Sequence, residues 1–358
     1  MKTIKYSSFR ILPTIIFIYL LCCLSHELKL TLTKQHMPIK NKAILGGVSL
    51  GYESESKSIS QVRFHFEISF NLSYCFFSRS TLYSGDGGVI YVSGGSYSMN
   101  VSNSMFYNCS CSLNGGAIYF SSSSNSCLRM ICANRCSCGA SSSGHLAYLI
   151  ASQVNKIDYL SVSNCSHTTS GIWSIRLDNG NQRVDNTNSS MNNVIRVSGI
   201  GFFYTSSFTC SYCTFSNNKL SDGICIYFRT SSGIMTFSNI VHNNSPSGYG
   251  IVDVFEGSPK MHYCIFQDNQ NTLFSVRSGS LEVSHSFISY SGMLSTSTQV
   301  SMANNNSLSK RETYQIPFFN SHYCNADSTI ITQTNVNTFH QSSLKSNIFI
   351  NSLIQFLL

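Results

Sequence analysis

The chain has 358 residues, only 11% of them charged, and its excess of Lys and Arg gives a formal net charge of +8. So little charge, combined with 42% hydrophobic residues, excludes a charged disordered chain and is typical of stacked polar strands. The basic residues are scattered and form no patch between residues 85 and 290, so we expect no nucleic-acid partner.

The N-terminal segment 1–25 matches a secretory signal peptide. It starts with basic residues, continues with an apolar run from Ile11 to Leu24, and places Cys23 and Ser25 where a signal peptidase selects small side chains. An uncleaved signal anchor, which would attach the chain to a membrane, is the alternative, although the apolar run is shorter than the roughly 20 residues that span a bilayer. Both interpretations predict a secreted or cell-surface protein.

Residues 26–84 are predicted to form an N-terminal cap or a first coil of the repeat that follows. Phe64, Phe66, Ile68 and Phe70 alternate with polar residues, which indicates a half-buried strand. Such a strand suits the end of a repeat structure, where open strand edges must be covered.

A glycine followed by a short apolar run recurs about every 27 residues between 85 and 290, which is the signature of a repeat architecture. We expect these glycines at a corner that requires positive φ or close backbone approach. They are Gly88, Gly116, Gly144, Gly171, Gly199, Gly223 and Gly250.

A second pattern runs in phase with the glycines: an apolar residue followed three positions later by Asn or Cys. The apolar members are Phe106, Ile131, Val162, Phe215, Ile240 and Phe266, and the asparagines that follow are Asn134, Asn218, Asn243 and Asn269. One member is missing near residues 187–189, where only polar residues stand. We predict that the apolar residues form an internal column and the asparagines a ladder of hydrogen-bonded amides.

The glycine pattern and the apolar pattern recur with the same period, which requires a structure in which each period makes one full circuit. The sequence therefore predicts an all-β fold, a single right-handed parallel β-helix of about eight coils over residues 85–290. Leucine-rich and helical solenoids are excluded because neither leucine spacing nor a 3.6-residue apolar stripe is present. The handedness follows from the general rule for parallel crossovers.

The segment Gly115-Gly116-Ala117-Ile118 and the Phe-x-x-Asn pairs Phe215/Asn218 and Phe266/Asn269 resemble the repeats of chlamydial polymorphic outer membrane proteins. Similar β-helical repeats occur in surface proteins of parasitic protists such as trichomonads. The resemblance covers about residues 85–290 and implies a surface or secreted location and adhesion. The bacterial members also carry a C-terminal translocating barrel, for which residues 291–358 are too short; this segment is predicted to be a C-terminal cap or a loose tail.

The cysteines and sequons add predictions that depend on the compartment. Cys111 and Cys136 each lie five residues after their coil's apolar anchor, so stacking would bring them within disulfide distance; stacked free thiols are the alternative. A zinc site among the neighbouring cysteines is disfavoured because no histidine joins them at ligand spacing, and no metal or cofactor is predicted. Candidate glycosylation sites are Asn71, Asn100, Asn108, Asn164, Asn188, Asn243 and Asn305.

No catalytic residues are predicted, because the acidic residues and histidines of the repeat are dispersed and no acidic pair is expected to stack in adjacent coils. The favoured function is a non-enzymatic, adhesin-like binding protein with an unknown extracellular protein or glycan as partner. Tyr91, Tyr119, Tyr148 and Tyr227 recur after the coil glycines, either as an outward ligand platform or as core residues. A polysaccharide lyase or hydrolase on a pectate-lyase-like β-helix is the alternative.

Overall fold

The computed structural model describes residues 41–45, 48–52, 64–66, 69–73, 75–165, 171–205, 207–220, 223–246, 249–289, 292–295, 297–305 and 312–316. The predicted signal peptide, Ile68 and most of the segment 291–358 lie outside these ranges. Within them every regular element is a strand, and no helix is present that could cross a membrane.

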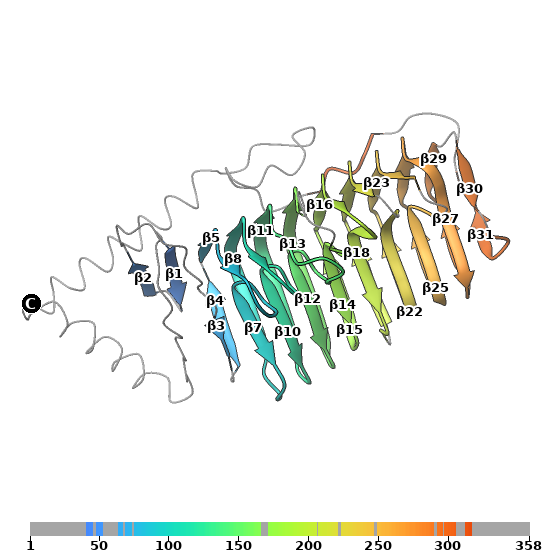
Figure 1. Cartoon of the computed structure of the whole chain (residues 1–358). Coiled ribbons are helices and arrows are strands. Elements are labelled where there is room, and N and C mark those ends of the chain that lie inside the picture. The colour runs from blue at the N-terminus through green and yellow to red at the C-terminus, as the bar shows by residue number, and fades with distance from the viewer. Residues whose placement is uncertain are drawn as a thin grey trace, which may run out of the picture.

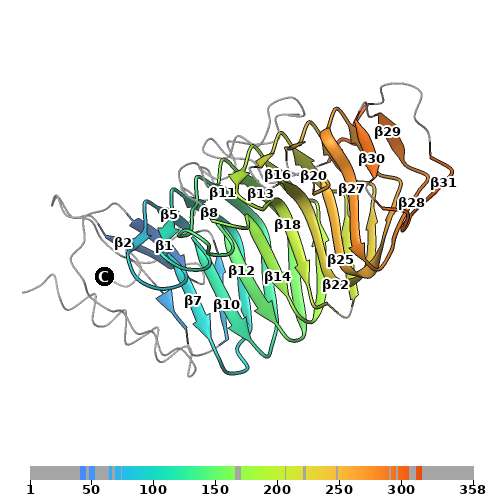
Figure 2. The same ribbon diagram turned by 45° about the vertical axis from the view of Figure 1, so that its right-hand side comes forward.

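The chain folds as one right-handed parallel β-helix of about eight turns, which confirms the predicted fold. Figures 1 and 2 show the coils stacked side by side along one axis. Each coil contributes strands to three faces, and each strand pairs in parallel with its counterparts in the coils before and after it.

The first face contains β3 (Phe64–His65), β7 (Ile90–Ser93), β10 (Ile118–Ser122), β12 (Ala147–Ala151), β14 (Ile175–Asp178), β18 (Val197–Phe203), parts of β22 (Ile224–Thr236), β25 (Val252–His262) and β27 (Gln270–Ser278), and β30 (Met293–Ser295). The second face contains β4 (Phe70–Ser73), the first parts of β8 (Met99–Tyr107), β11 (Ser126–Asn134) and β13 (Val154–Ser163), then β15 (Asn181–Asp185), β19 (Ser207–Ser211), the ends of β22 and β25, β28 (Leu281–Ser284) and β31 (Val300–Ala303).

The third face contains β5 (Phe76–Ser78), the ends of β8, β11 and β13, β16 (Asn188–Ser190), β20 (Thr214–Ser216), β23 (Asn239–Val241), β26 (Ile265–Gln267) and β29 (Phe287–Ser289). Short ladders follow it: β6 (Thr81–Leu82) with β9 (Ser110–Cys111), and β17 (Asn193–Val194), β21 (Lys219–Leu220) and β24 (Asn244–Ser245) with the start of β27.

Both ends of the stack extend beyond the expected limits of 85 and 290. Strands β3 to β6 already pair in parallel with the next coil, so part of the segment 26–84 is a first coil. Before it, β1 (Asn41–Leu45) and β2 (Val48–Tyr52) form an antiparallel hairpin that contacts β5. At the other end, β30 and β31 continue the parallel pairing to Ala303.

The corner between the second and third faces is made by one residue per coil in the left-handed conformation. Its φ lies between 47° and 56° at Asn103, Met130, Tyr159, Asn186, Tyr212, Phe237, Tyr263, His285 and Asn304. This conformation costs an L-residue roughly 1–2 kcal/mol, so the strand ladders on both sides must hold it in place. Glycine is absent from this corner, and the glycine pattern of the sequence does not reveal it.

The strand pairing defines columns, by which we mean sets of residues at equivalent positions in successive coils. The predicted apolar column includes Phe106, Val162, Phe215, Ile240 and Phe266, each opposite its neighbour in the pairing or separated from it by one intervening coil. The prediction for Ile131 is wrong by two positions: Ala133 pairs with Phe106 and Val162, whereas Ile131 pairs with Ser104 and Leu160.

The degenerate coil keeps its place in this column with a polar residue. Ser189 pairs with Val162 on one side and Phe215 on the other, and it is fully buried. Its hydroxyl donates to the carbonyl oxygens of Ser198 and Gly199, which satisfies the polar atom inside the apolar column.

An asparagine ladder follows the apolar column by three residues. The Oδ1 atoms of Asn218, Asn243 and Asn269 accept the backbone N–H of Asn192, Asn218 and Asn243 at 3.0–3.1 Å. The Nδ2 atoms of Asn218 and Asn243 donate to the next amide oxygen at 3.0 and 3.1 Å. Asn192, which the sequence pattern missed, is therefore the first member. Each buried amide oxygen accepts a backbone N–H of the preceding coil at a turn, where that N–H has no partner in a strand.

The same two-residue error in register makes the predictions for Asn134 and for the disulfide wrong. Asn134 pairs with Tyr107 and Ser163 outside the ladder. The bridge between Ser110 and Ser137 places Cys136 opposite Cys109 and Cys111 opposite Cys138, so Cys111 and Cys136 do not pair and both are free. Cys132, in contrast, is disulfide-bonded.

The coil glycines occupy more than one position. Gly87, Gly115 and Gly144 share a positive-φ corner, with φ of 67°, 68° and 77°. Gly88 and Gly116 lie one position later, where an added Cβ would stand 2.2 Å from a carbonyl oxygen of the next coil. Gly88 and Gly116 are therefore not equivalent to Gly144. Gly223 has a positive φ of 75°, whereas Gly171, Gly199 and Gly250 do not. An added Cβ at Gly199 or Gly250 would nevertheless stand 2.5 or 2.6 Å from a backbone atom of the next coil, which is the predicted close approach.

Replacing Asn218 by Ala should test the ladder. The variant leaves the buried backbone N–H of Asn192 and the amide oxygen of Asn243 with fewer partners, so we expect the free energy of unfolding to fall by about 2–4 kcal/mol. Urea denaturation measures this loss. The control Asn193→Ala, exposed on the neighbouring β17, should stay within about 0.5 kcal/mol of the wild type, and equal losses would contradict the ladder.

Candidate ligand-binding face

The outward side chains of the first face form a column that begins with tyrosines. Tyr91, Tyr119 and Tyr148 pair in register and are half-buried, so they lie on the outside of the solenoid and not in its core. The rings of Tyr91 and Tyr119 stack with centroids 5.4 Å apart, and Tyr119 meets Tyr148 edge-on at 5.7 Å.

The same column continues through Arg176, Gly201, Tyr227 and Asp253. Tyr227, the fourth predicted tyrosine, is therefore equivalent to the other three but is 6% exposed. Additional side chains must therefore cover the Tyr227 ring, and they come from the positions on either side of this column.

A second apolar cluster covers Tyr227 on the outside of the first face. Its buried members are Trp173, Val197, Phe203, Ile224 and Tyr227. Gly201 makes room for it, because an added Cβ would stand 2.7 Å from the Phe203 ring and 3.3 Å from the Trp173 ring. Trp173 meets Phe203 edge-on with centroids 4.8 Å apart. Aromatic residues thus pack together without belonging to the solenoid core.

One edge of the cluster is fixed by an ion pair. Arg176 donates to both carboxylate oxygens of Asp178 at 2.9 Å, and its guanidinium carbon lies 4.2 Å from the Phe203 ring centroid. Tyr148 also donates to Asp178, at 3.0 Å. Burial raises the pKa of Tyr148, and the nearby Asp178 charge raises it further, so the phenol stays protonated as a donor.

The opposite edge contains a buried carboxylate. Asp253 has no exposed side-chain surface, and its Oδ2 accepts from Arg277 at 2.6 Å. Arg277 also donates to the Tyr227 hydroxyl at 3.2 Å. Burial raises the pKa of Asp253, while Arg277 opposes that rise. Arg277 of β27 therefore connects β25 and β22 through its ion pair with Asp253 and its hydrogen bond to Tyr227.

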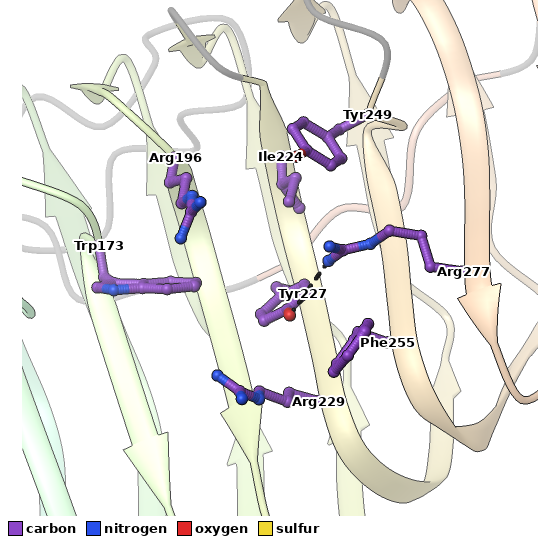
Figure 3. Close-up of a pocket in the computed structure, with 8 residues that line it drawn as sticks. All are labelled: Trp173, Arg196, Ile224, Tyr227, Arg229, Tyr249, Phe255 and Arg277. Atoms are coloured by element: carbon purple, nitrogen blue, oxygen red, sulfur yellow. Dashed lines mark hydrogen bonds between the residues drawn. The ribbon is translucent and has the colours of Figure 1, made fainter.

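A cavity of about 190 Å³ lies over this cluster. Figure 3 shows Arg196, Arg229 and Arg277 arranged around Tyr227, with Trp173 at one side and Phe255 at another. Ile224 and Tyr249 complete its lining. The sequence patterns do not reveal the three arginines, because these residues are far apart in the chain and only the strand register brings them together.

The sequons fall into exposed and buried groups. Asn71, Asn100, Asn108, Asn164 and Asn305 have exposed or half-buried side chains. Asn188 and Asn243 are 2% and 0% exposed, and Asn243 belongs to the asparagine ladder. Glycosylation of these two sites stays a prediction, and the burial of their side chains disfavours it.

One acidic pair does stack, contrary to expectation. Asp158 and Asp185 pair in register on β13 and β15. Burial and the Asp158 charge raise the pKa of Asp185, and Arg129 lies 3.6 Å from the Asp158 carboxylate. Both residues lie 14 positions after a coil glycine, Gly144 and Gly171, which is the signal that could have found them.

A buried Cys–His pair lacks the properties of a nucleophilic site. Sγ of Cys138 lies 3.5 Å from Nδ1 of His145, and both residues are almost inaccessible to solvent. Burial raises the pKa of the Cys138 thiol and lowers that of His145 to about 4. Both groups are therefore neutral at pH 7, whereas a thiolate is the reactive form.

Comparison with protein-family models, with curated proteins and with solved structures found no match to this chain. Among the residues that the structure describes, no three His, Cys, Asp or Glu side chains are grouped to hold a metal ion. The outer aromatic cluster and its arginines are thus the arrangement from which a function must be inferred.

Replacing Gly201 by Ala should open this cluster. The new methyl group must displace the rings of Phe203 and Trp173, and Trp173 is the only tryptophan of the chain. We expect its fluorescence emission to shift to the red and its quenching by acrylamide to increase. Ser93→Ala, exposed on β7, should change neither, and an unchanged spectrum in Gly201→Ala would contradict the packing described.

Proposed function

We propose that this chain is a non-enzymatic, adhesin-like binding protein, secreted or on the cell surface, that contacts an extracellular partner with the outer side of its first face. The observation that carries the proposal is the aromatic cluster around Trp173 and Tyr227, which lies outside the solenoid core. Ligand sites are concave, rich in aromatic side chains and supplied with a few polar groups. The cavity over this cluster has all three properties.

The polar groups of this face favour binding over catalysis. Asp178 is engaged by Arg176 and Tyr148, and Asp253 by Arg277. A general acid or base needs a proton-transfer group that can reach the substrate, and these two carboxylates are already held by cations. A secreted or surface location is favoured by the signal-like segment 1–25 and by the exposed sequons Asn71 and Asn100.

The resemblance to polymorphic outer membrane protein repeats supports the same class of function. Of the residues that carry it, Phe215 and Phe266 lie in the apolar column, and Asn218 and Asn269 in the asparagine ladder. These are positions that build the solenoid, so the resemblance supports a surface-exposed scaffold and leaves the ligand to the outward side chains.

Binding by the secreted chain to an array of glycans and extracellular proteins tests the proposal. We expect retention of at least one partner without its degradation, and a loss of about tenfold or more in affinity for Phe255→Ala, whose half-buried ring lines the cavity, since a central aromatic anchor contributes about 2 kcal/mol or more. Tyr83→Ala, whose side chain is 62% exposed and lies outside this face, should bind normally. Absence of any retained partner would overturn the proposal.

The Asp158/Asp185 pair supports a second candidate, a polysaccharide hydrolase. Paired strands lie about 4.8 Å apart, close to the roughly 5–5.5 Å between the carboxyl groups of retaining glycosidases, and a carboxyl group with a raised pKa, as at Asp185, suits the acid role. Release of reducing ends from a polysaccharide panel, abolished in Asp185→Asn, would support the hydrolase. The binding function predicts no release by either protein.

The same variant should reveal the charge repulsion. A carboxyl group whose pKa is raised by folding binds protons more tightly in the native state, so its contribution to stability falls as pH rises through the raised pKa. We expect Asp185→Asn to gain about 0.2–1 kcal/mol at neutral pH, the usual range for cross-strand pairs, and nothing below pH 4. Urea denaturation at several pH values measures this difference; Glu256→Gln, on an exposed corner, is the control.

A further inference from the structure

The cavity over Tyr227 has an excess of positive charge. It is lined by Arg196, Arg229 and Arg277, and only Arg277 has a carboxylate partner, Asp253. In the described part of the chain, Arg196 and Arg229 take part in no ion pair. Two guanidinium groups thus line one small cavity without an ion-pair partner in the described part of the chain, although the charge of Arg196 also acts on Asp253.

Arg229 has an unsatisfied donor at this place. Its Nε is buried and has no hydrogen-bond partner, although its guanidinium carbon lies 5.3 and 5.6 Å from the ring centroids of Tyr204 and Phe255. A buried charged donor without an acceptor costs free energy. An anion bound in the cavity that Arg229 lines would compensate the charge of this guanidinium group, and planar guanidinium groups bind oxyanions through paired hydrogen bonds.

The size and the walls of the cavity restrict the ligand. A volume of about 190 Å³ is below the roughly 300 Å³ at which drug-sized clefts begin. We therefore expect a ligand unit no larger than a single six-membered ring. Phe255 and Tyr249, which are both half-buried, offer apolar surface beside the charges (Figure 3), and the tyrosine column continues along the face for a longer polymer.

We propose that this cavity binds one acidic sugar unit of a glycan, with the carboxylate or sulfate held by Arg196 and Arg229 and the ring packed beside Phe255. This inference rests on the proposed binding function and specifies its ligand class. Arg277 remains paired with Asp253 and shields the ligand from that carboxylate.

Titration of the chain with four polymers, followed by Trp173 fluorescence and by a direct binding assay, tests the inference. The probes are polygalacturonate, dextran sulfate, neutral dextran and polyglutamate. We expect the two acidic glycans to bind and to change the emission, with affinity falling about tenfold in Arg196→Gln and in Arg229→Gln because each removes one charge-assisted contact. Arg183→Gln, an exposed arginine of β15, should bind as the wild type.

The outcomes separate this inference from the broader function. Binding of neutral dextran with equal affinity, or acidic-glycan binding unchanged in Arg196→Gln and Arg229→Gln, overturns the anionic site while leaving a binding protein. Tighter binding of polyglutamate than of either acidic glycan overturns the sugar in favour of an acidic protein segment. A chain that binds none of the probes but retains another partner on the array also overturns the inference, and only failure on the array as well overturns the proposed function.

Discussion

Backbone pairing between successive coils is the constraint on which the rest of the structure depends. Each strand hydrogen-bonds to its counterparts in the coils before and after it, so every side chain lies over the equivalent side chain of its neighbour. The ladder of Asn192, Asn218, Asn243 and Asn269 extends this pairing through a turn where strands are short. Ser189 shows how strict the register is, because a polar residue remains in the apolar column and satisfies its hydroxyl locally.

The same constraint explains why a cavity forms on the outside. Outward columns are as ordered as inward ones, and on the first face the column of Tyr148, Arg176 and Tyr227 is interrupted by Gly201. The pairing of β18 with β22 is also irregular between Val197 and Ile200. The rings of Phe203 and Trp173 fill the space that a side chain at position 201 would need, and the cavity lies beside these rings, where Trp173 and three arginines line it.

The period of the repeat predicted the fold, the apolar column and three members of the asparagine ladder, because these features depend only on recurrence. Exact register was harder to predict, since a pattern of an apolar residue followed three positions later by Asn or Cys matches Ile131 and Asn134 as well as the true positions Ala133 and Cys136. That error of two residues produced the wrong Cys111–Cys136 pair.

The candidate site could not be predicted for a related reason. Whether the tyrosines point inward or outward depends on strand parity, and Arg196, Arg229 and Arg277 occupy three different positions in their coils. No single column contains them, so recurrence does not detect them. Trp173 lies before its strand β14 and pairs with Val197 by one isolated bridge, a contact that no local pattern specifies.

Arg277 has a different role from the other two arginines of the cavity. Asp253 is buried on the outward column, and an unpaired carboxylate there would repel any anion that approached Arg196 and Arg229. Arg277 neutralises it and at the same time orients the Tyr227 hydroxyl. The positive charge that remains available to a ligand therefore comes from Arg196 and Arg229. Arg277 and Asp253 form an ion pair that holds the Tyr227 side chain in place. An anion binds well only where such a buried opposing charge is already compensated.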